Sequence, residues 1–253
     1  MSPQISFLNT TIDNLSMQDT LKMVEQAIVE NKQLHHAAVN ASVLVDLQKD
    51  NELRKSVNSA DIVNVDGQAV VWASKFLGSP LKERVAGPDL MANLIELAYK
   101  ENYKIYLLGA KEEVVSKLVA IYKEKYSPSI IAGYRNGYFQ DEDEGAIVDD
   151  IVNSGAQMLF VAITSPKKET FLHKHKKSLS KVNFIMGVGG SFDVFAGKTK
   201  RAPQWMQKSG FEWFYRFLQE PKRMWKRYLV GNTEFIMLVL REKYFKKTKK
   251  NSS

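Results

Sequence analysis

MGVGGSFDVFAGKTKRAP, Met186–Pro203, is the stretch that decides the fold and the first candidate site of this chain. The apolar run at residues 183–186 predicts a short buried strand, and the glycines after it predict a tight turn. Such a turn can direct backbone N–H groups at one anion, although a strand–helix turn without a ligand has the same composition. The spacing GxGGSxD matches neither the dinucleotide-binding G-x-G-x-x-G nor the P-loop. We predict a site for an anionic ligand at Gly187, Gly189, Gly190 and Ser191, with the Asp193 carboxylate held beside it.

The same order of apolar run, polar turn and helical pattern recurs along the chain before this segment. Strands are predicted at residues 36–41, 62–65, 104–108, 130–133, 157–163 and 183–186. Helices are predicted at residues 13–30, 43–51, 68–77, 90–101, 112–126, 141–154 and 170–180. About six such units in series favour an α/β fold built on a doubly wound, mainly parallel, Rossmann-like sheet.

Polar residues at the carboxyl ends of these strands are the candidate site, because ligands of doubly wound sheets bind there. Asp66 directly follows a strand and is a candidate general base, with a cap for the helix near Gln68 as the alternative. Arg84 lies in a loop, where its guanidinium either clamps phosphate oxygens or stays an exposed charge. The further candidates for substrate or nucleotide binding are Asn40, Gly109, Lys167, Lys168 and Glu169; the last three also fit a solvated helix start.

The composition limits the chemistry and the location. The 253 residues include no Cys and four His, with no H-E-x-x-H pattern, so we expect no metal site and metal-independent chemistry. The N-terminal residues lack the basic region and apolar core of a signal peptide. No apolar run approaches the ~20 residues that span a bilayer. We therefore expect a cytoplasmic protein.

Charge divides the chain into two parts. From Lys198 onward there are 15 basic and four acidic residues, whereas the preceding residues hold 21 basic and 24 acidic ones. Residues 1–203 are expected to form the Rossmann-like catalytic domain, and residues 204–253 a basic, aromatic-rich helical appendage. Aromatic rings among cations suit an anionic membrane interface. The alternatives are surface helices docked by their aromatic residues and, less favoured because the main body is acidic, nucleic-acid binding.

Several motifs together resemble the WecG/TagA/CpsF family of bacterial glycosyltransferases, over nearly the whole chain. They include Val65-Asp66-Gly67, Arg84-Val85-Ala86-Gly87-Pro88, Met186–Pro203, Glu212-Trp213-Phe214-Tyr215-Arg216 and Glu220-Pro221-Lys222-Arg223. The resemblance implies inverting, metal-independent transfer of an N-acetylmannosamine-type sugar from a UDP donor. The implied acceptor is a polyprenyl-diphosphate-linked N-acetylglucosamine at the inner face of the membrane, in teichoic acid or surface polysaccharide synthesis.

The resemblance also implies roles for individual residues. Asp66 matches the proposed base, Arg84 a residue that engages the diphosphate, and Arg216 and Arg223 cations that stabilise the departing UDP. Lys168 stands where the family has Gln, which bears on donor choice. Lys226 with Arg227 stands where relatives carry a third Arg. The family further suggests a peripheral membrane protein that self-associates.

Two other classes of protein remain as alternatives from the sequence. A soluble nucleotide-sugar epimerase or dehydrogenase requires a G-x-G-x-x-G turn near the N-terminus, which this chain lacks. A non-enzymatic membrane or nucleic-acid adaptor accounts for the basic tail but not for the polar turns at the strand ends. The sequence favours the membrane-associated UDP-sugar transferase.

Overall fold

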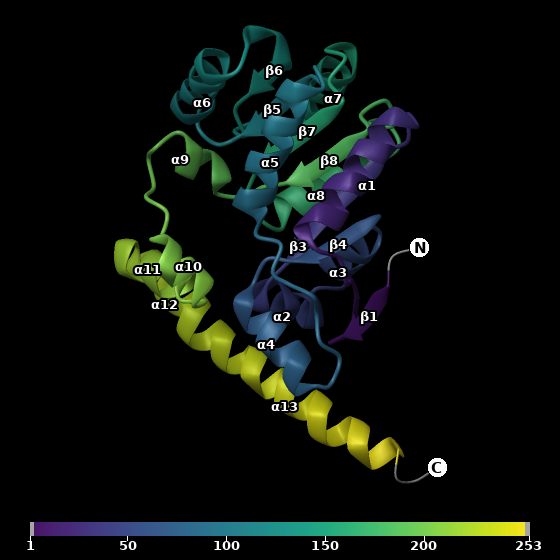
Figure 1. Ribbon diagram of the computed structural model, residues 1–253, viewed down its shortest axis with the longest axis vertical. Helices are drawn as coiled ribbons and strands as arrows, with labels where there is room; N and C mark the ends of the chain where they lie inside the picture. The colour runs from purple at the N-terminus through teal and green to yellow at the C-terminus, as the bar shows by residue number, and fades with distance from the viewer. Residues whose placement is uncertain (1–2, 251–253) are drawn as a thin grey trace.

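The computed structural model describes residues 3–250, apart from the side chains at positions 223, 226, 227 and 245–250. Its centre is a six-stranded sheet in the order β4-β3-β8-β7-β5-β6, and every neighbouring pair is parallel. The strands are β3 (Leu34–Val39), β4 (Ile62–Val65), β5 (Ile105–Gly109), β6 (Ile131–Arg135), β7 (Met158–Ala162) and β8 (Phe184–Gly187). The predicted Rossmann-like parallel sheet is thus confirmed (Figure 1).

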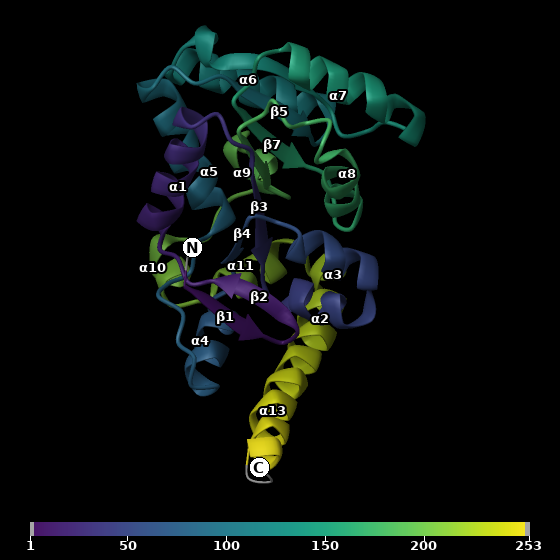
Figure 2. The same ribbon diagram turned by 90° about the vertical axis from the view of Figure 1, so that its right-hand side faces the viewer.

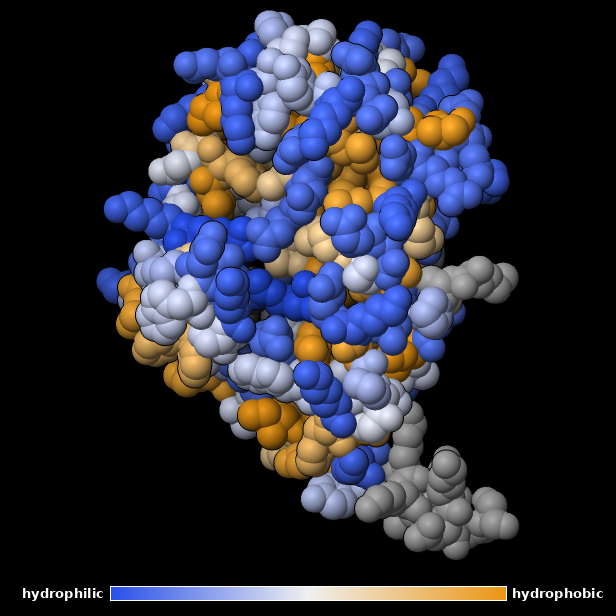
Figure 3. All heavy atoms as spheres, viewed as in Figure 1, coloured by the Kyte–Doolittle hydropathy of each residue, from blue (hydrophilic) through white to orange (hydrophobic). Residues whose placement is uncertain are grey.

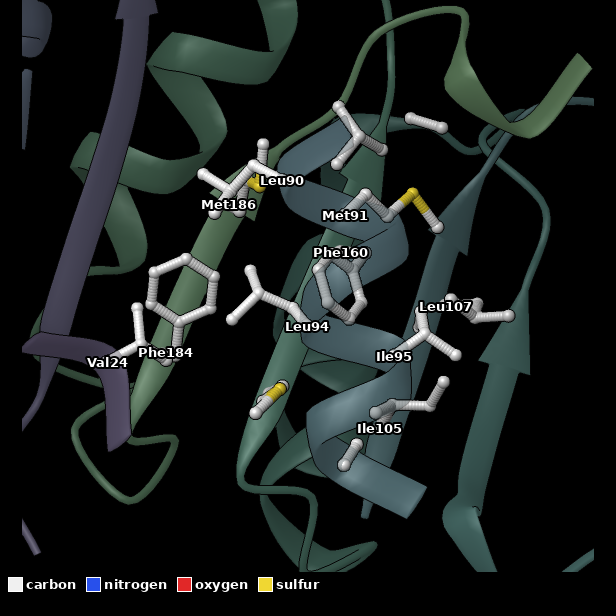
Figure 4. Close-up of a cluster of buried hydrophobic side chains, with 14 of the residues drawn as sticks. Val24, Leu90, Met91, Leu94, Ile95, Ile105, Leu107, Phe160, Phe184 and Met186 are labelled. Atoms are coloured by element: carbon white, nitrogen blue, oxygen red, sulfur yellow. The ribbon is translucent and has the colours of Figure 1, made fainter. Parts of the chain in front are cut away.

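Helices cover both faces of the sheet (Figure 2). The helices α1 (Met17–Val29), α5 (Gly87–Lys100) and α6 (Glu112–Lys125) pack on one face, and α7 (Glu144–Asn153) and α8 (Lys167–His175) on the other. Alternate residues of a strand point to opposite faces, so Ile105 and Leu107 join the α1–α5–α6 core while Tyr106 and Leu108 join the α7–α8 core. Figure 4 shows the first of these cores, where α5 lies against β5, β7 and β8.

The N-terminus forms a β-hairpin that the sequence reading missed. The strands β1 (Gln4–Phe7) and β2 (Thr10–Asp13) pair antiparallel across a turn in which Leu8 and Asn9 have positive φ. The helix predicted from residue 13 begins only at Met17, because Ser16 caps it and forms a capping box with Asp19. Asp13 belongs to β2 instead, and its carboxylate accepts a hydrogen bond from the Val63 backbone N–H at 2.8 Å.

Other predicted boundaries also shift. After α2 (Ala41–Lys49), Asp50 caps a further helix, α3 (Asn51–Asn58), that was not predicted. The helix α4 (Gln68–Phe76) agrees with its prediction. The helix predicted at 170–180 is α8 and starts three residues earlier, at Lys167. Short 3-10 turns, η1 (Pro128–Ile130) and η2 (Asp141–Asp143), precede β6 and α7.

The C-terminal part is helical, as predicted. After the short helix α9 (Ser191–Phe195), which precedes it, this part comprises α10 (Gln204–Lys208), α11 (Glu212–Gln219), α12 (Pro221–Trp225), the π-helix η3 (Lys226–Val230) and α13 (Gly231–Lys250). The long helix α13 lies along α2 and buries Phe235 and Val239 in the core that contains α2, α3 and α4. Lys49 on α2 forms an ion pair with Glu234 at 2.6 Å. The helix α13 is therefore docked on the α2 side of the molecule by apolar contacts and one ion pair.

The exposed side of this C-terminal part carries many apolar residues. The exposed ones include Phe214, Leu218, Trp225, Leu229, Ile236, Met237 and Leu240. Apolar surface runs along the edge formed by α11–α13 (Figure 3). Among the described residues, no helix is both long and apolar enough to cross a bilayer.

Candidate active site

The carboxyl ends of β4, β3 and β8 lie next to one another, because these strands are neighbours in the sheet. Three segments singled out from the sequence therefore meet at one edge of the sheet. Asn40 follows β3, Asp66 follows β4, and the glycine turn follows β8. The backbone N–H of Asp66 donates to the Val39 carbonyl at 2.9 Å, which continues the pairing of β3 and β4 past the end of β4.

Asp66 does not cap the helix after it. The N-cap of α4 is Gly67, which has no side chain to donate or accept. The Asp66 carboxylate instead faces the first turn of α5, where a Cβ added to Gly87 would lie 3.3 Å from Oδ2. Gly87 thus lets the N-terminus of α5 approach the carboxylate closely, and Asp66 as a whole residue is partly buried. The capping alternative is wrong, and the role of Asp66 as a base stays a prediction.

The surroundings of Asp66 raise the pKa of its carboxyl to about 6. Burial is the largest cause, because it penalises the charged form. The Glu212 carboxylate also raises this pKa, whereas Arg84, the Gly87 backbone N–H and Arg216 lower it. A carboxylate with a pKa near neutrality both ionises at physiological pH and accepts a proton readily, as a general base must.

Arg84 lies in the loop before α5, and its side chain is 14% exposed. Its Nη1 donates to Glu212 Oε2 at 3.2 Å, so a residue of the catalytic domain is paired with the first residue of α11. The neighbouring backbone N–H of Val85 donates to the Val65 carbonyl at 2.8 Å and fixes this loop beside β4. Arg84 is therefore not the exposed loop charge that was its alternative; its charge lowers the pKa of Asp66, and it already has a carboxylate partner.

The appendage brings one further predicted cation to this site. Arg216, on α11, is partly buried and lowers the pKa of Asp66 through its charge. Arg223 belongs to α12 and Arg227 to η3, and both of their side chains lie outside the described residues. The roles of Arg223 and Arg227 stay predictions.

The glycine turn after β8 has two open positions. A Cβ added at Gly189, where φ is +50°, or at Gly190 would meet no atom within 4 Å, so this turn leaves room above its backbone. Ser191 is buried and donates its hydroxyl to the Val188 carbonyl at 2.7 Å, which holds the turn together. Asp193 pairs with Lys198 at 3.5 Å. The backbone of Gly189 and Gly190 is therefore the part of the turn that has free space beside it.

The other predicted ligand contacts have partners within the protein. The Asn40 side chain caps α2 by accepting from the Val43 N–H at 3.1 Å. Gly109, with φ +130°, packs so tightly that an added Cβ would lie 2.4 Å from the Ala162 carbonyl oxygen. Lys167 donates to the Phe139 carbonyl at 2.9 Å. These three residues shape the edge of the sheet by local structure.

Lys168 and Glu169 lie in the first turn of α8, so the helix start named as the alternative is present, but they form an ion pair of 2.8 Å and their side chains are only 18% and 12% exposed. The Lys168 stem lies against Gly187, where an added Cβ would be 2.5 Å from Cδ. The pair borders a small cavity that is also lined by His35, His36 and Ser56. Because Glu169 neutralises it, Lys168 adds no net positive charge beside β8.

Sequence reasoning missed three charged residues of this region. Glu212 Oε1 accepts from Arg201 Nε at 3.4 Å, and Arg201 in turn forms a bidentate pair with Asp89 in the first turn of α5. The result is a chain of alternating charges, Arg84–Glu212–Arg201–Asp89. On the face drawn in Figure 3, strongly hydrophilic residues line a hollow between α9 and α10. Within the described residues, no group of three or more His, Cys, Asp or Glu is arranged to hold a metal ion.

The fold and this arrangement define an α/β protein with a carboxylate and guanidinium groups at the carboxyl edge of a parallel sheet. The particular family follows from comparison with known proteins. The model of the glycosyl transferase WecG/TagA/CpsF family matches residues 5–249, so the chain belongs to this family and is a glycosyltransferase. This assignment removes the two alternatives, a nucleotide-sugar modifying enzyme and a non-enzymatic adaptor.

Two relatives carry the same name, N-acetylglucosaminyldiphosphoundecaprenol N-acetyl-beta-D-mannosaminyltransferase. The protein of Bacillus subtilis (strain 168) is 36% identical over 212 residues, which cover 84% of this chain and 81% of the relative. The protein of Bacillus spizizenii is 34% identical over 200 residues, which cover 79% of this chain and 76% of the relative.

Proposed function

We propose that this protein transfers N-acetylmannosamine from a UDP donor to N-acetylglucosamine carried on a polyprenyl diphosphate, with inversion at the anomeric carbon. The names of both Bacillus relatives support the transferred sugar and the acceptor. The observation that carries the mechanism is Asp66, a partly buried carboxylate with a pKa near 6 between Arg84 and Arg216.

Asp66 acts as the base in a single displacement. The oxygen of the acceptor hydroxyl attacks the anomeric carbon of the donor and forms a new C–O bond. The proton of this hydroxyl moves to the Asp66 carboxylate. The bond between the anomeric carbon and the diphosphate oxygen breaks, and UDP leaves with both bonding electrons. Guanidinium groups suit the negative charge that develops on the departing diphosphate, because they form two parallel hydrogen bonds to phosphate oxygens. Arg84 and Arg216 are the described candidates, and Arg223 and Arg227 are the predicted ones.

The sugar of the donor is uncharged in this proposal. An acidic sugar would need an unpaired cation beside the sheet, and the Lys168 ammonium is neutralised by Glu169 at 2.8 Å. The open glycine positions Gly189 and Gly190 are the proposed cradle for the diphosphate. No residue cluster suited to a metal accompanies them in the described chain, and the proposed mechanism is metal-independent. Turnover should therefore persist in excess EDTA.

The appendage is proposed to hold the enzyme on the inner face of the membrane, where a lipid-linked acceptor resides. Exposed aromatic residues such as Trp225 and Trp213 lie close in sequence to the basic residues of α12 and α13. Rings and cations in this arrangement suit the headgroup region of anionic lipid. Sedimentation with phosphatidylglycerol vesicles, lost in high salt and absent with phosphatidylcholine, tests this. Concentration-dependent self-association without vesicle binding would instead assign the apolar surface to an oligomer.

The deciding experiment measures UDP release from a panel of UDP-sugars, with and without a short-chain lipid-diphosphate-N-acetylglucosamine. We expect release from UDP-N-acetylmannosamine only when the acceptor is present, and a loss of ~10²–10⁴-fold in Asp66→Asn. Asp149→Asn is the matched control, because Asp149 is an exposed carboxylate on α7. Full turnover in Asp66→Asn would exclude Asp66 as the base, and release from a different donor alone would exclude the proposed sugar.

A further inference from the structure

Glu212 joins the appendage to the catalytic domain at the site itself. It is the first residue of α11, and its side chain is only 22% exposed. One carboxylate oxygen accepts from Arg84 Nη1 at 3.2 Å and the other from Arg201 Nε at 3.4 Å. A carboxylate that bridges two guanidinium groups is held in position by both of its oxygens. Glu212 thus fixes where α11 begins.

The position of Glu212 also sets the position of Arg216. The two residues are four apart on α11, so their side chains lie on the same face of the helix. Both Glu212 and Arg216 are near enough to Asp66 for their charges to act on its carboxyl group, and the Glu212 carboxylate contacts Arg84 beside it. Anchoring the first residue of the helix therefore brings the Arg216 guanidinium to the site.

The anchor extends to the helix that Asp66 faces. Arg201 pairs with Glu212 on one side and with Asp89 on the other, with Nη2 2.8 Å from Asp89 Oδ2. Asp89 lies in the first turn of α5, two residues after Gly87, whose backbone approaches Asp66. One continuous chain of charges therefore connects α11 to the N-terminus of α5.

We propose that Glu212 is a positioning residue that fixes α11 in the donor-free enzyme through its pairs with Arg84 and Arg201. When the donor binds, the pair between Glu212 and Arg84 breaks, and Arg84 binds the diphosphate instead. The inference rests on the proposed function, since it takes Arg84 as a ligand of the donor diphosphate. Carboxylate and phosphate are alternative partners for the same guanidinium fork. Arg201, with its second partner Asp89, keeps Glu212 and α11 in place after Arg84 is released.

Two measurable consequences follow for Glu212→Gln, which keeps the shape of the side chain but removes its charge. Arg84 loses its competing carboxylate, so UDP should bind roughly threefold to tenfold more tightly. The weaker anchor should lower kcat about tenfold, since Arg216 is no longer held at the reacting groups. Tighter binding together with slower turnover is a combination that simple loss of folding does not produce.

The pH profile gives an independent measurement. The acid limb of the pH profile, where kcat/KM falls as the pH is lowered, gives the pKa of the base in the free enzyme. The groups that face Asp66 are Arg84 from the loop, the Gly87 N–H from α5, and Glu212 and Arg216 from α11. Removing the negative charge of Glu212 should move the acid limb to lower pH, by up to about one unit.

Glu234→Gln is the matched control. Glu234 is also an appendage carboxylate paired with the catalytic domain, to Lys49 at 2.6 Å, but it lies on α13, away from the chain of charges. Glu234→Gln should leave the acid limb and the UDP affinity unchanged. Glu212→Asp keeps the charge while it shortens the side chain, so it should retain the wild-type acid limb and still lower kcat. It also provides the test if Glu212→Gln does not fold.

The outcomes separate this inference from the function on which it rests. If Arg84→Ala weakens UDP binding but Glu212→Gln changes neither UDP affinity nor the acid limb, Glu212 has no positioning role and the proposed function stands. If Arg84→Ala leaves UDP binding unchanged, the diphosphate role of Arg84 and this inference both fail. Equal effects of Glu234→Gln and Glu212→Gln would show that loose docking of the appendage is the cause, and would overturn the inference.

Discussion

Replacing Asp66 by Asn should make the protein more stable at alkaline pH while it removes activity. The folded state holds the Asp66 proton up to a pH of about 6, whereas the unfolded chain releases it near 3.8. The folded state therefore binds more protons than the unfolded state between these values, and stability falls as pH rises through this window. Below pH 3.8 the carboxyl is protonated in both states and contributes no difference.

The size of the effect follows from the shift. Each unit of difference between the folded and unfolded pKa corresponds to about 1.4 kcal/mol. The charged carboxylate of Asp66 therefore lowers the free energy of unfolding by up to about 3 kcal/mol above pH 6, and by about 1–3 kcal/mol once the partial exposure of the residue is included. Asn has nearly the same shape, and its oxygen still accepts from the Gly87 N–H. Asp66→Asn should therefore raise the free energy of unfolding by about 1–3 kcal/mol at pH 8 and leave it nearly unchanged at pH 3.5.

Urea unfolding of both proteins at the two pH values, followed by tryptophan fluorescence, measures this difference. Asp149→Asn, on the exposed face of α7, controls for the general loss of one negative charge. The reasoning is refuted if Asp66→Asn is less stable than the wild type at pH 8. Attraction to Arg84 and Arg216 would then outweigh burial, and the carboxylate would be too weak a base for its proposed role.

Three further predictions follow from named contacts. The kcat/KM of the wild type should fall about tenfold per pH unit below pH 6, as Asp66 becomes protonated; a flat profile down to pH 5 would contradict this. Gly109→Ala should lower the free energy of unfolding by at least about 2 kcal/mol, because the new Cβ would lie 2.4 Å from the Ala162 carbonyl oxygen; an unchanged melting temperature would show that β7 shifts without a loss of stability. Lys168→Gln should lower the free energy of unfolding by about 1–3 kcal/mol, because the Glu169 carboxylate loses its partner. The double variant Lys168→Gln/Glu169→Gln should recover most of this stability in the same thermal unfolding experiment.

The sheet was predictable because its strands are short runs of apolar residues followed by polar turns. All residues of β5 and β7 are buried, so their sequences lack the polar positions that an exposed strand or helix would show. The N-terminal hairpin was missed for the opposite reason. Its strands have four residues each and mix buried with exposed positions, and its turn contains no glycine.

The site was predictable only where chain order places a residue at a strand end. Asp66 was found in this way, since it directly follows the apolar run of β4. Glu212 and Arg201 were not, because their partners are far away in the chain: Arg84 and Glu212 are 128 residues apart, and Asp89 and Arg201 are 112 apart. No local pattern reports pairing over such distances. An acidic first residue in α11 has a sufficient local explanation in the helix dipole.

The charges at the site bear on the role that we propose for residues 204–253. Asp66, Glu212 and Asp89 are balanced by Arg84, Arg201 and Arg216, so the donor-free site is neutral when all six groups are charged. A bound diphosphate adds negative charge that this set does not compensate, and the charge on the leaving group grows as UDP departs. The sequence supplies further cations after α11, Arg223 and Arg227, and we expect these to compensate the added charge. In the role that we propose for it, the Glu212 anchor keeps α11, and therefore the start of the segment that carries these cations, in position when the donor binds.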